Sequence, residues 1–188
     1  MHRQHKGLSL LVPGTQICSF GAGAYDQQKE RVMDKILHHS VRLPCDRKRA
    51  FKMFTVNENL QSWLTTVANI ETVVGGKYEL FWNPDDREND STVGCKITAI
   101  EPDIFLSFQW KGPKQYKDFM NNADPLTHVV VCFADCAEGG GQAPCTEVHV
   151  VHSGWRSSPQ WEEARLWFEK AWDFSLDALR KKLIAESA

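Results

Sequence analysis

The sequence has no long hydrophobic run: its apolar stretches fall far short of the roughly 20 residues that a helix needs to cross a bilayer. It also lacks an excess of charge of one sign, because 22 lysines and arginines stand against 24 aspartates and glutamates, a net charge of −2 over 188 residues. Such a chain has no broad positive field to hold a phosphate backbone. We therefore predict neither a membrane span nor a nucleic-acid partner.

Acidic residues are absent from the first 25 positions, which contain only Arg3 and Lys6 as cationic side chains. The one apolar run there, residues 8–12, is too short for the core of a secretory signal. We expect residues 1–33 to form a flexible N-terminal extension and residues 34–188 to form one folded domain. The expected location is the reducing cytoplasm, with mitochondrial import as the minor alternative.

Familiar catalytic motifs are also absent. The sequence contains no Gly-x-Ser-x-Gly and no His-Glu-x-x-His. Gly75-Gly76-Lys77 is not a phosphate-binding loop, because Glu71 stands where the first glycine belongs and a strand is expected to follow. The sequence supports no catalytic set, so we favour a binding protein over an enzyme, and we expect no cofactor.

A metal site is the first interpretation to test for Cys132, Cys136, Cys145 and His149. If a hairpin pairs Cys136 with Cys145, then Cys132 faces His149, and the two pairs lie about 13 Å apart along the strand. Tetrahedral zinc requires every ligand at about 2.0–2.3 Å, so one ion cannot bind both pairs. We predict no metal and ordinary thiols, with a Cys136–Cys145 disulfide left open under oxidation.

The pattern of apolar residues predicts an α+β fold. Alternation over residues 36–43 indicates a first strand that stops at Pro44, and helical spacing after Cys45 indicates two short helices separated near Asn57. Six further strands are expected, joined by turn residues in an antiparallel meander. Their expected ranges are 67–74, 77–82, 92–100, 104–110, 127–136 and 146–153.

A long helix is expected after the strands. Ser158 is suited to be its N-cap and Pro159 its first residue. One stripe of the helix is apolar and consists of Trp161, Phe168, Trp172, Leu179 and Leu183. This is the only expected helix long enough to cover the sheet, and a curved sheet around a single helix tends to leave a pocket between them.

These patterns resemble the START-like (SRPBCC) superfamily and, within it, the activator of heat-shock protein 90 ATPase family, over about residues 34–183. The segments that carry the resemblance are Leu43-Pro44, Phe51, Leu60-x-x-Trp63-Leu64, Gly75-Gly76-Lys77-Tyr78-Glu79-Leu80, Gly94 with Ile100-Glu101-Pro102, the run from Thr146 to Trp155 that contains His152-Ser-Gly154, and Trp172, Leu176 and Leu179.

The resemblance implies a helix-grip fold: a curved antiparallel sheet of about six or seven strands wraps a long C-terminal helix, two short helices follow the first strand, and a cavity lies inside. The function expected first is binding or sensing of a small apolar molecule by a monomer or weak homodimer. A co-chaperone-like module that binds or stimulates heat-shock protein 90 is the alternative. A cyclase or hydrolase that uses the same cavity is the second alternative.

Alternating aromatic and apolar residues on the expected inner face are the candidate ligand-binding set, although a solid aromatic core explains the pattern equally well. The set comprises Tyr78, Leu80, Trp82, Leu106, Phe108, Trp110, Val131, His152, Phe168 and Trp172. His152 is the one titratable member, on a face otherwise formed by valines and Phe133, and is a weak candidate acid or base. The alternative for His152 is a bond to the backbone near Trp155.

Overall fold

The computed structural model describes residues 35–136 and 144–187, so the expected extension over residues 1–33 lies outside the described residues. The predicted elements occur in the predicted order and the α+β class is confirmed, but a 3-10 turn and a short helix over residues 114–120 were not predicted. The elements are β1 (Leu37–Leu43), α1 (Arg47–Thr55), α2 (Asn57–Gln61), β2 (Val67–Ile70), β3 (Tyr78–Phe81), β4 (Ile97–Glu101), β5 (Phe105–Trp110), a 3-10 turn (Lys114–Tyr116), α3 (Lys117–Met120), β6 (Thr127–Asp135), β7 (Thr146–Ser153) and α4 (Pro159–Ser187).

Five strands form an antiparallel sheet in the order β1-β7-β6-β5-β4. In the β6–β7 hairpin, Val129 pairs with His152 and Val131 with Val150, which is the predicted register. Because side chains alternate between faces, this register places His152 and the paired valines on the buried face together. All four are fully buried.

The remaining strands, β2 and β3, form a separate antiparallel pair rather than a full extension of the sheet. The segment that precedes β4, residues 91–96, pairs with β3 and its flanking residue only through two isolated bridges, Lys77–Lys96 and Phe81–Ser91. Between these bridges the Thr92 hydroxyl accepts a hydrogen bond from the Leu80 amide and donates one to the Tyr78 carbonyl. A side chain thus replaces part of the strand ladder, and β4 begins only at Ile97, later than the sequence pattern predicted.

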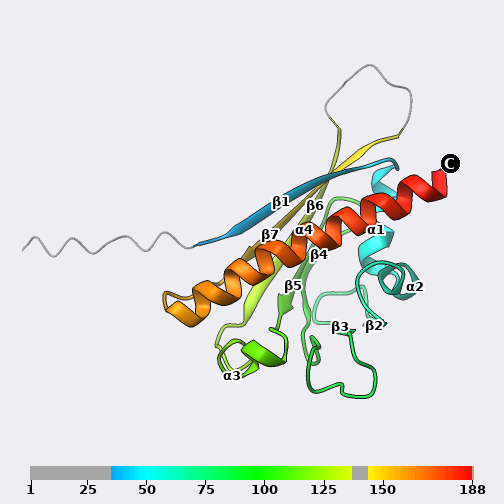
Figure 1. Cartoon of the computed structure of the whole chain (residues 1–188). Helices are drawn as coiled ribbons and strands as arrows, with labels where there is room; N and C mark the ends of the chain where they lie inside the picture. The colour runs from blue at the N-terminus through cyan, green and yellow to red at the C-terminus, as the bar shows by residue number, and fades with distance from the viewer. Residues whose placement is uncertain (1–34, 137–143, 188) are drawn as a thin grey trace, which may run out of the picture. The chain divides into compact units, whose positions relative to one another are not determined.

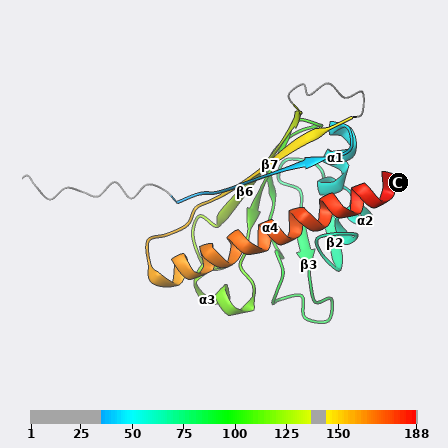
Figure 2. The same cartoon turned by 45° about the horizontal axis from the view of Figure 1, so that its top comes forward.

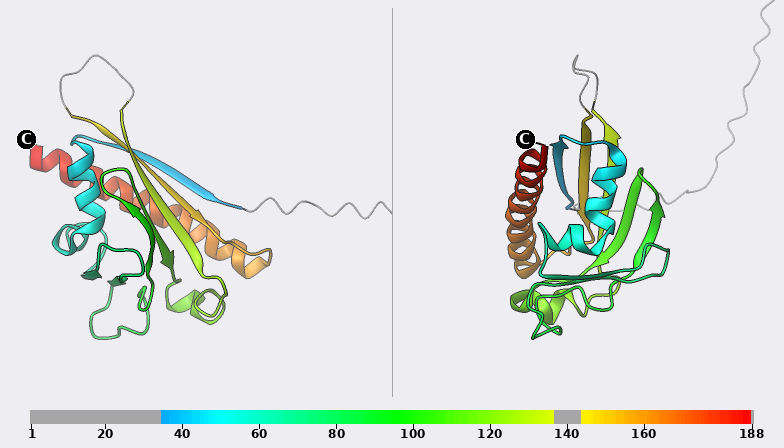
Figure 3. Two further views of the ribbon diagram at one scale, coloured as in Figure 1. Left: turned by 180° about the vertical axis from the view of Figure 1, so that it is seen from behind. Right: turned by 90° about the vertical axis from the view of Figure 1, so that its right-hand side faces the viewer.

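Helix α4 crosses one face of the sheet, as Figures 1 and 2 show. Its N-cap is as predicted: the Ser158 hydroxyl accepts a hydrogen bond from the Trp161 amide at 3.4 Å. The whole predicted stripe is buried, from Trp161 to Leu183. Beside α4 lies β1 (Figure 3, right), where His39 Nδ1 is 2.8 Å from Asp173 of the helix. The apolar stripe and this contact fix α4 against the sheet.

The other end of the buried face is covered by α1. Phe51 and Phe54 of this helix each make an edge contact with Phe133 of β6, with ring centroids 5.5 Å apart. Asp46 caps the helix by accepting a hydrogen bond from the Arg49 amide. Aromatic pairs of this kind add about 0.5–1.5 kcal/mol each beyond their burial. The core under α1 is therefore filled by side chains.

No helix of the described residues is long and apolar enough to span a membrane.

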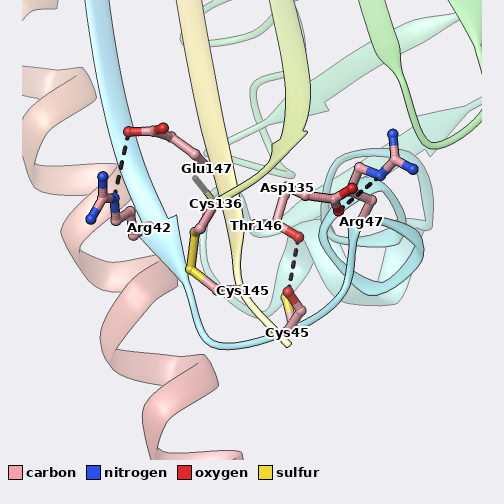
Figure 4. The surroundings of a disulfide bond; sticks show 8 residues. All are labelled: Arg42, Cys45, Arg47, Asp135, Cys136, Cys145, Thr146 and Glu147. Carbon is pink, nitrogen blue, oxygen red and sulfur yellow. Dashed lines mark hydrogen bonds and ion pairs between the residues drawn. A yellow bond between two sulfur atoms is a disulfide. The ribbon is translucent and has the colours of Figure 1, made fainter. Parts of the chain in front are cut away.

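Figure 4 shows a disulfide between Cys136 and Cys145, at the end of the β6–β7 hairpin. The sequence left this pairing open, and the structure forms it. Nearby, the Thr146 hydroxyl donates to the Cys45 carbonyl at 2.8 Å, and Arg47 forms an ion pair with Asp135 at 3.1 Å. These contacts join the hairpin end to the segment that leads into α1.

Candidate functional site

An aromatic pocket of about 530 Å³ lies between α4 and the segments that follow β3 and β5. This volume is within the range of sites that bind small molecules, about 300–1,000 Å³. Five of the seven tryptophans of the chain line it. The lining consists of Trp63, Leu64, Trp82, Asn83, Asp90, Ser91, Trp110, Lys111, Gly112, Pro113, Trp167, Phe168, Ala171, Trp172, Phe174 and Ser175.

Hydrogen bonds hold several of the indole rings in place. Trp82 Nε1 donates to the Leu64 carbonyl at 2.7 Å, and Trp63 Nε1 donates to the Met53 carbonyl at 3.0 Å. Trp110 contacts Trp82 edge-on at a centroid distance of 6.0 Å. These contacts fix the positions of the three rings in the wall of the pocket.

Large aromatic side chains remain exposed at the mouth of the pocket. Phe174 of α4 is 79% exposed, Trp167 is 40% exposed and Trp82 is 37% exposed. Exposed rings gathered around one hollow are unusual on a soluble surface and mark a binding site more often than chance. The mouth of the pocket therefore presents aromatic surface to the solvent.

Apart from Ser175 of α4, the polar side chains of the lining lie on the segments that follow β3 and β5, around Asp90 and Lys111. Asp90 Oδ1 accepts a hydrogen bond from the Lys114 backbone amide at 2.9 Å, which ties the two segments together. The Lys111 ammonium donates to the carbonyl of Val93, a residue outside the lining, at 2.6 Å. The pocket therefore combines an extensive apolar wall with a small polar side.

The ten residues predicted to bind a ligand divide into two groups. Trp82, Trp110, Phe168 and Trp172 line the pocket. The other six lie in the solid core: Tyr78, Leu80, Leu106, Phe108, Val131 and His152. Both of the alternatives that the sequence left open are thus present, in different parts of the same face.

Tyr78 and Phe108 show why part of the face is filled. Their rings stack with centroids 3.7 Å apart, and the Tyr78 hydroxyl donates to the Phe54 carbonyl of α1 at 3.1 Å. Burial raises the pKa of the Tyr78 phenol well above its ordinary value. Helix α1 therefore closes this end of the face.

His152 is fully buried behind the pocket, among Trp110, Trp155, Phe168 and Trp172. Its Nδ1 accepts a hydrogen bond from Trp172 Nε1 at 3.2 Å, so the neutral ring carries its proton on Nε2. Burial lowers the pKa of His152 to about 3. The His152 ring makes no bond to the backbone near Trp155 among the described residues, contrary to that alternative; instead, the His152 carbonyl accepts a hydrogen bond from Trp155 Nε1 at 3.0 Å.

The Nε2 atom of His152 has no hydrogen-bond partner among the described residues, and the same holds for Trp110 Nε1. Both atoms are buried. His152 does not line the pocket. Its contacts describe a neutral ring that orients Trp172, and its role as an acid or base stays a prediction.

Sequence reasoning missed the second aromatic stripe of α4. Trp167, Ala171 and Phe174 follow at spacings of four and three, next to the buried stripe, and all three line the pocket. Large apolar residues beside a complete stripe were the available signal. The polar side, around Asp90 and Lys111, had no such signal because irregular segments carry no periodicity.

The other cysteines that the structure describes do not form a metal site. Cys132 pairs with His149 across the strands as predicted, and Cys45, Cys95 and Cys132 are free. Within residues 35–136 and 144–187, no group of three or more His, Cys, Asp or Glu side chains is placed to hold a metal ion. Burial raises the pKa of the Cys45 thiol to about 11 and that of Cys95 to about 12, so neither is a ready thiolate.

An antiparallel sheet that holds one long C-terminal helix, with a pocket between them, defines the START-like helix-grip class. Within this class, the family described as activator of Hsp90 ATPase homolog 1-like protein matches residues 44–183. The chain belongs to this family. A comparison with curated protein sequences finds no match.

Solved structures agree with this class. Protein MLL2253 from Mesorhizobium loti is 17% identical, with a TM-score of 0.61 over 82% of this chain and 99% of that one. The Aha1 dimer from Colwellia psychrerythraea is 16% identical, with a TM-score of 0.56 over 79% and 96%. An HSP90 activator from Plasmodium falciparum is 18% identical, with a TM-score of 0.57 over 79% and 95%. At these identities the likeness establishes the fold.

Proposed function

We propose that the protein binds a small, largely apolar molecule in the pocket beside α4. The observation that carries the proposal is the pocket itself, about 530 Å³ in volume and lined by five tryptophans and two phenylalanines. Aromatic walls with a few polar groups at one side are typical of small-molecule sites. The START-like fold supports ligand binding in general, since it leaves a space between its sheet and its long helix.

The rings around the mouth strengthen the proposal. Phe174 is 79% exposed although it is a phenylalanine on a helix that buries other aromatic residues. Burying an exposed ring of this size against a ligand stabilises the complex by about 1.5–3 kcal/mol. Any apolar molecule that fills the pocket and covers the Phe174 ring would obtain this binding free energy.

A pocket-filling substitution tests the proposal. Ala171 is a half-buried lining residue, so Ala171→Phe places a ring inside the pocket. Ala185→Phe is the matched control, because Ala185 is exposed on the same helix and does not line the pocket. The probe is N-phenyl-1-naphthylamine, whose fluorescence rises in apolar surroundings.

We expect the wild type and Ala185→Phe to bind the probe alike and Ala171→Phe to bind it at least tenfold more weakly. Circular dichroism confirms that each variant is folded. Absence of probe binding by the wild type, or equal binding by all three proteins, would overturn the proposal.

A role as an activator of heat-shock protein 90 is the second candidate. It is favoured by the family match over residues 44–183 and by the Plasmodium falciparum HSP90 activator among the similar structures. An ATPase assay of that chaperone, with and without the full chain, tests it. A clear dose-dependent stimulation would place this role first, and no stimulation at saturating protein would remove it.

A further inference from the structure

We propose that the pocket selects apolar ligands that carry a positive charge, such as hydrophobic amines or quaternary ammonium compounds. This inference rests on the proposed function and names the chemical class of its ligand. It follows from two observations: the orientation of the aromatic rings and the single carboxylate of the lining.

The aromatic rings of the lining are inclined to one another rather than stacked in parallel. Trp82 is inclined by 69° to Trp110, and Trp110 is inclined by 45° to Trp172, with centroids 6.0 and 5.3 Å apart. Phe168 is inclined by 80° to Trp110. Indole faces attract cations, and a pocket lined by five tryptophans offers aromatic surface of the kind that binds quaternary ammonium groups.

Asp90 adds a full negative charge on the polar side of the pocket. It is half-buried, and its Oδ1 atom is engaged by the Lys114 backbone amide rather than by a cation. Asp90 has no ion pair within residues 35–136 and 144–187. Its charge is therefore available to a ligand.

Lys111 is the one cationic residue of the lining, and its charge is directed elsewhere. Its ammonium donates to the carbonyl of Val93, and a Cβ placed on Gly94 would lie 3.6 Å from the same Nζ atom. Neither Val93 nor Gly94 lines the pocket. The groups of the lining that favour a cation are thus the indole faces and Asp90, while the Lys111 ammonium keeps its charge and is held toward Val93.

Three probes of matched shape test the inference: benzyltrimethylammonium, its neutral carbon isostere neopentylbenzene, and anionic phenylmethanesulfonate. Each is titrated against bound N-phenyl-1-naphthylamine, and its displacement constant is measured. We expect the cation to bind about tenfold more tightly than the neutral isostere, which corresponds to about 1.4 kcal/mol, and the anion to bind most weakly.

Two variants assign the preference to its sources. Asp90→Asn should reduce the preference for the cation to about threefold or less, whereas Asp85→Asn should leave it unchanged. Asp85 is the matched control, because it is an exposed acid of the same segment that does not line the pocket. Phe174→Leu keeps an apolar side chain at an exposed position, so it should weaken cation binding more than neutral-probe binding.

The outcomes separate this inference from the function on which it rests. If N-phenyl-1-naphthylamine does not bind the wild type, the proposed function itself is wrong. If it binds but the cation and the neutral isostere displace it equally, only the charge preference is wrong. Tighter binding of the anion than of the neutral isostere would also overturn the inference and would assign the dominant charge to Lys111.

Discussion

Protonation of His152 should make the protein lose stability in mild acid. Burial lowers the pKa of this histidine from 6.5 to about 3, so the folded protein keeps it neutral while the unfolded chain binds a proton below pH 6.5. Stability then decreases as the pH falls from 6.5 to 3, and no loss from this group occurs above that window. The sign follows from the unfolded state binding the extra proton.

The magnitude follows from the size of the shift. Each pH unit below 6.5 costs about 1.4 kcal/mol for a single group, so the loss at pH 5 is about 2 kcal/mol and approaches about 5 kcal/mol near pH 3. A domain of ordinary stability, about 5–15 kcal/mol, would lose a measurable share by pH 5. His128 has its pKa lowered by burial as well and acts in the same direction.

Urea unfolding followed by tryptophan fluorescence, at several pH values from 7.5 to 5, measures the loss. His152→Asn isolates the contribution, because its Oδ1 atom can replace Nδ1 as the acceptor for Trp172 and the side chain does not titrate. His38→Asn is the control, since His38 lies exposed on the outer face of β1. We expect the His152→Asn curve to be flatter than the wild-type curve by about 2 kcal/mol at pH 5.

Parallel curves for the wild type and His152→Asn would refute the reasoning. So would an NMR titration in which the His152 ring of the folded wild type takes up a proton between pH 7 and 5.5.

Two further predictions concern stability. Trp172→Ala should lower the free energy of unfolding by about 3–5 kcal/mol, because the ring is only 3% exposed; a loss below about 2 kcal/mol in urea would show that neighbouring side chains fill the space. Reduction of the Cys136–Cys145 disulfide should cost about 2–3 kcal/mol, since it frees a short loop in the unfolded chain. Equal unfolding midpoints with and without dithiothreitol would contradict this.

The hairpin that contains His152 shows what the sequence could predict. Strict alternation from Thr127 to Asp135 and from Thr146 to Ser153 determined both strands and their register, because a shift by one residue would expose every buried valine. The stripe and the N-cap of α4 were predictable for a similar reason. Local pattern and long-range packing agree in these elements.

The extent of the pocket was not predictable in the same way. Alternation shows which face of a strand is buried, but it does not show how close the covering element lies. Tyr78 and Trp82 belong to the same alternating pattern of the sequence. Tyr78, however, is buried and bonds to Phe54 of α1, whereas Trp82 borders the pocket. The position of Asp90 beside the pocket is fixed by the hydrogen bond that its side chain accepts from the Lys114 amide. This contact joins two irregular segments, which no periodic pattern predicts.

Helix α4 carries its core residues and its pocket-lining residues on neighbouring stripes, and this division explains its composition. Leu176 and Leu179 are buried and hold the helix on the sheet, whereas Ala171 and Phe174 border the pocket and contribute less to packing. Phe168 and Trp172 belong to both groups, because each is buried and lines the pocket, and Trp172 also donates to His152. Substitutions at Ala171 or Phe174 should therefore change binding with little loss of stability, whereas those at Phe168 or Trp172 should change both.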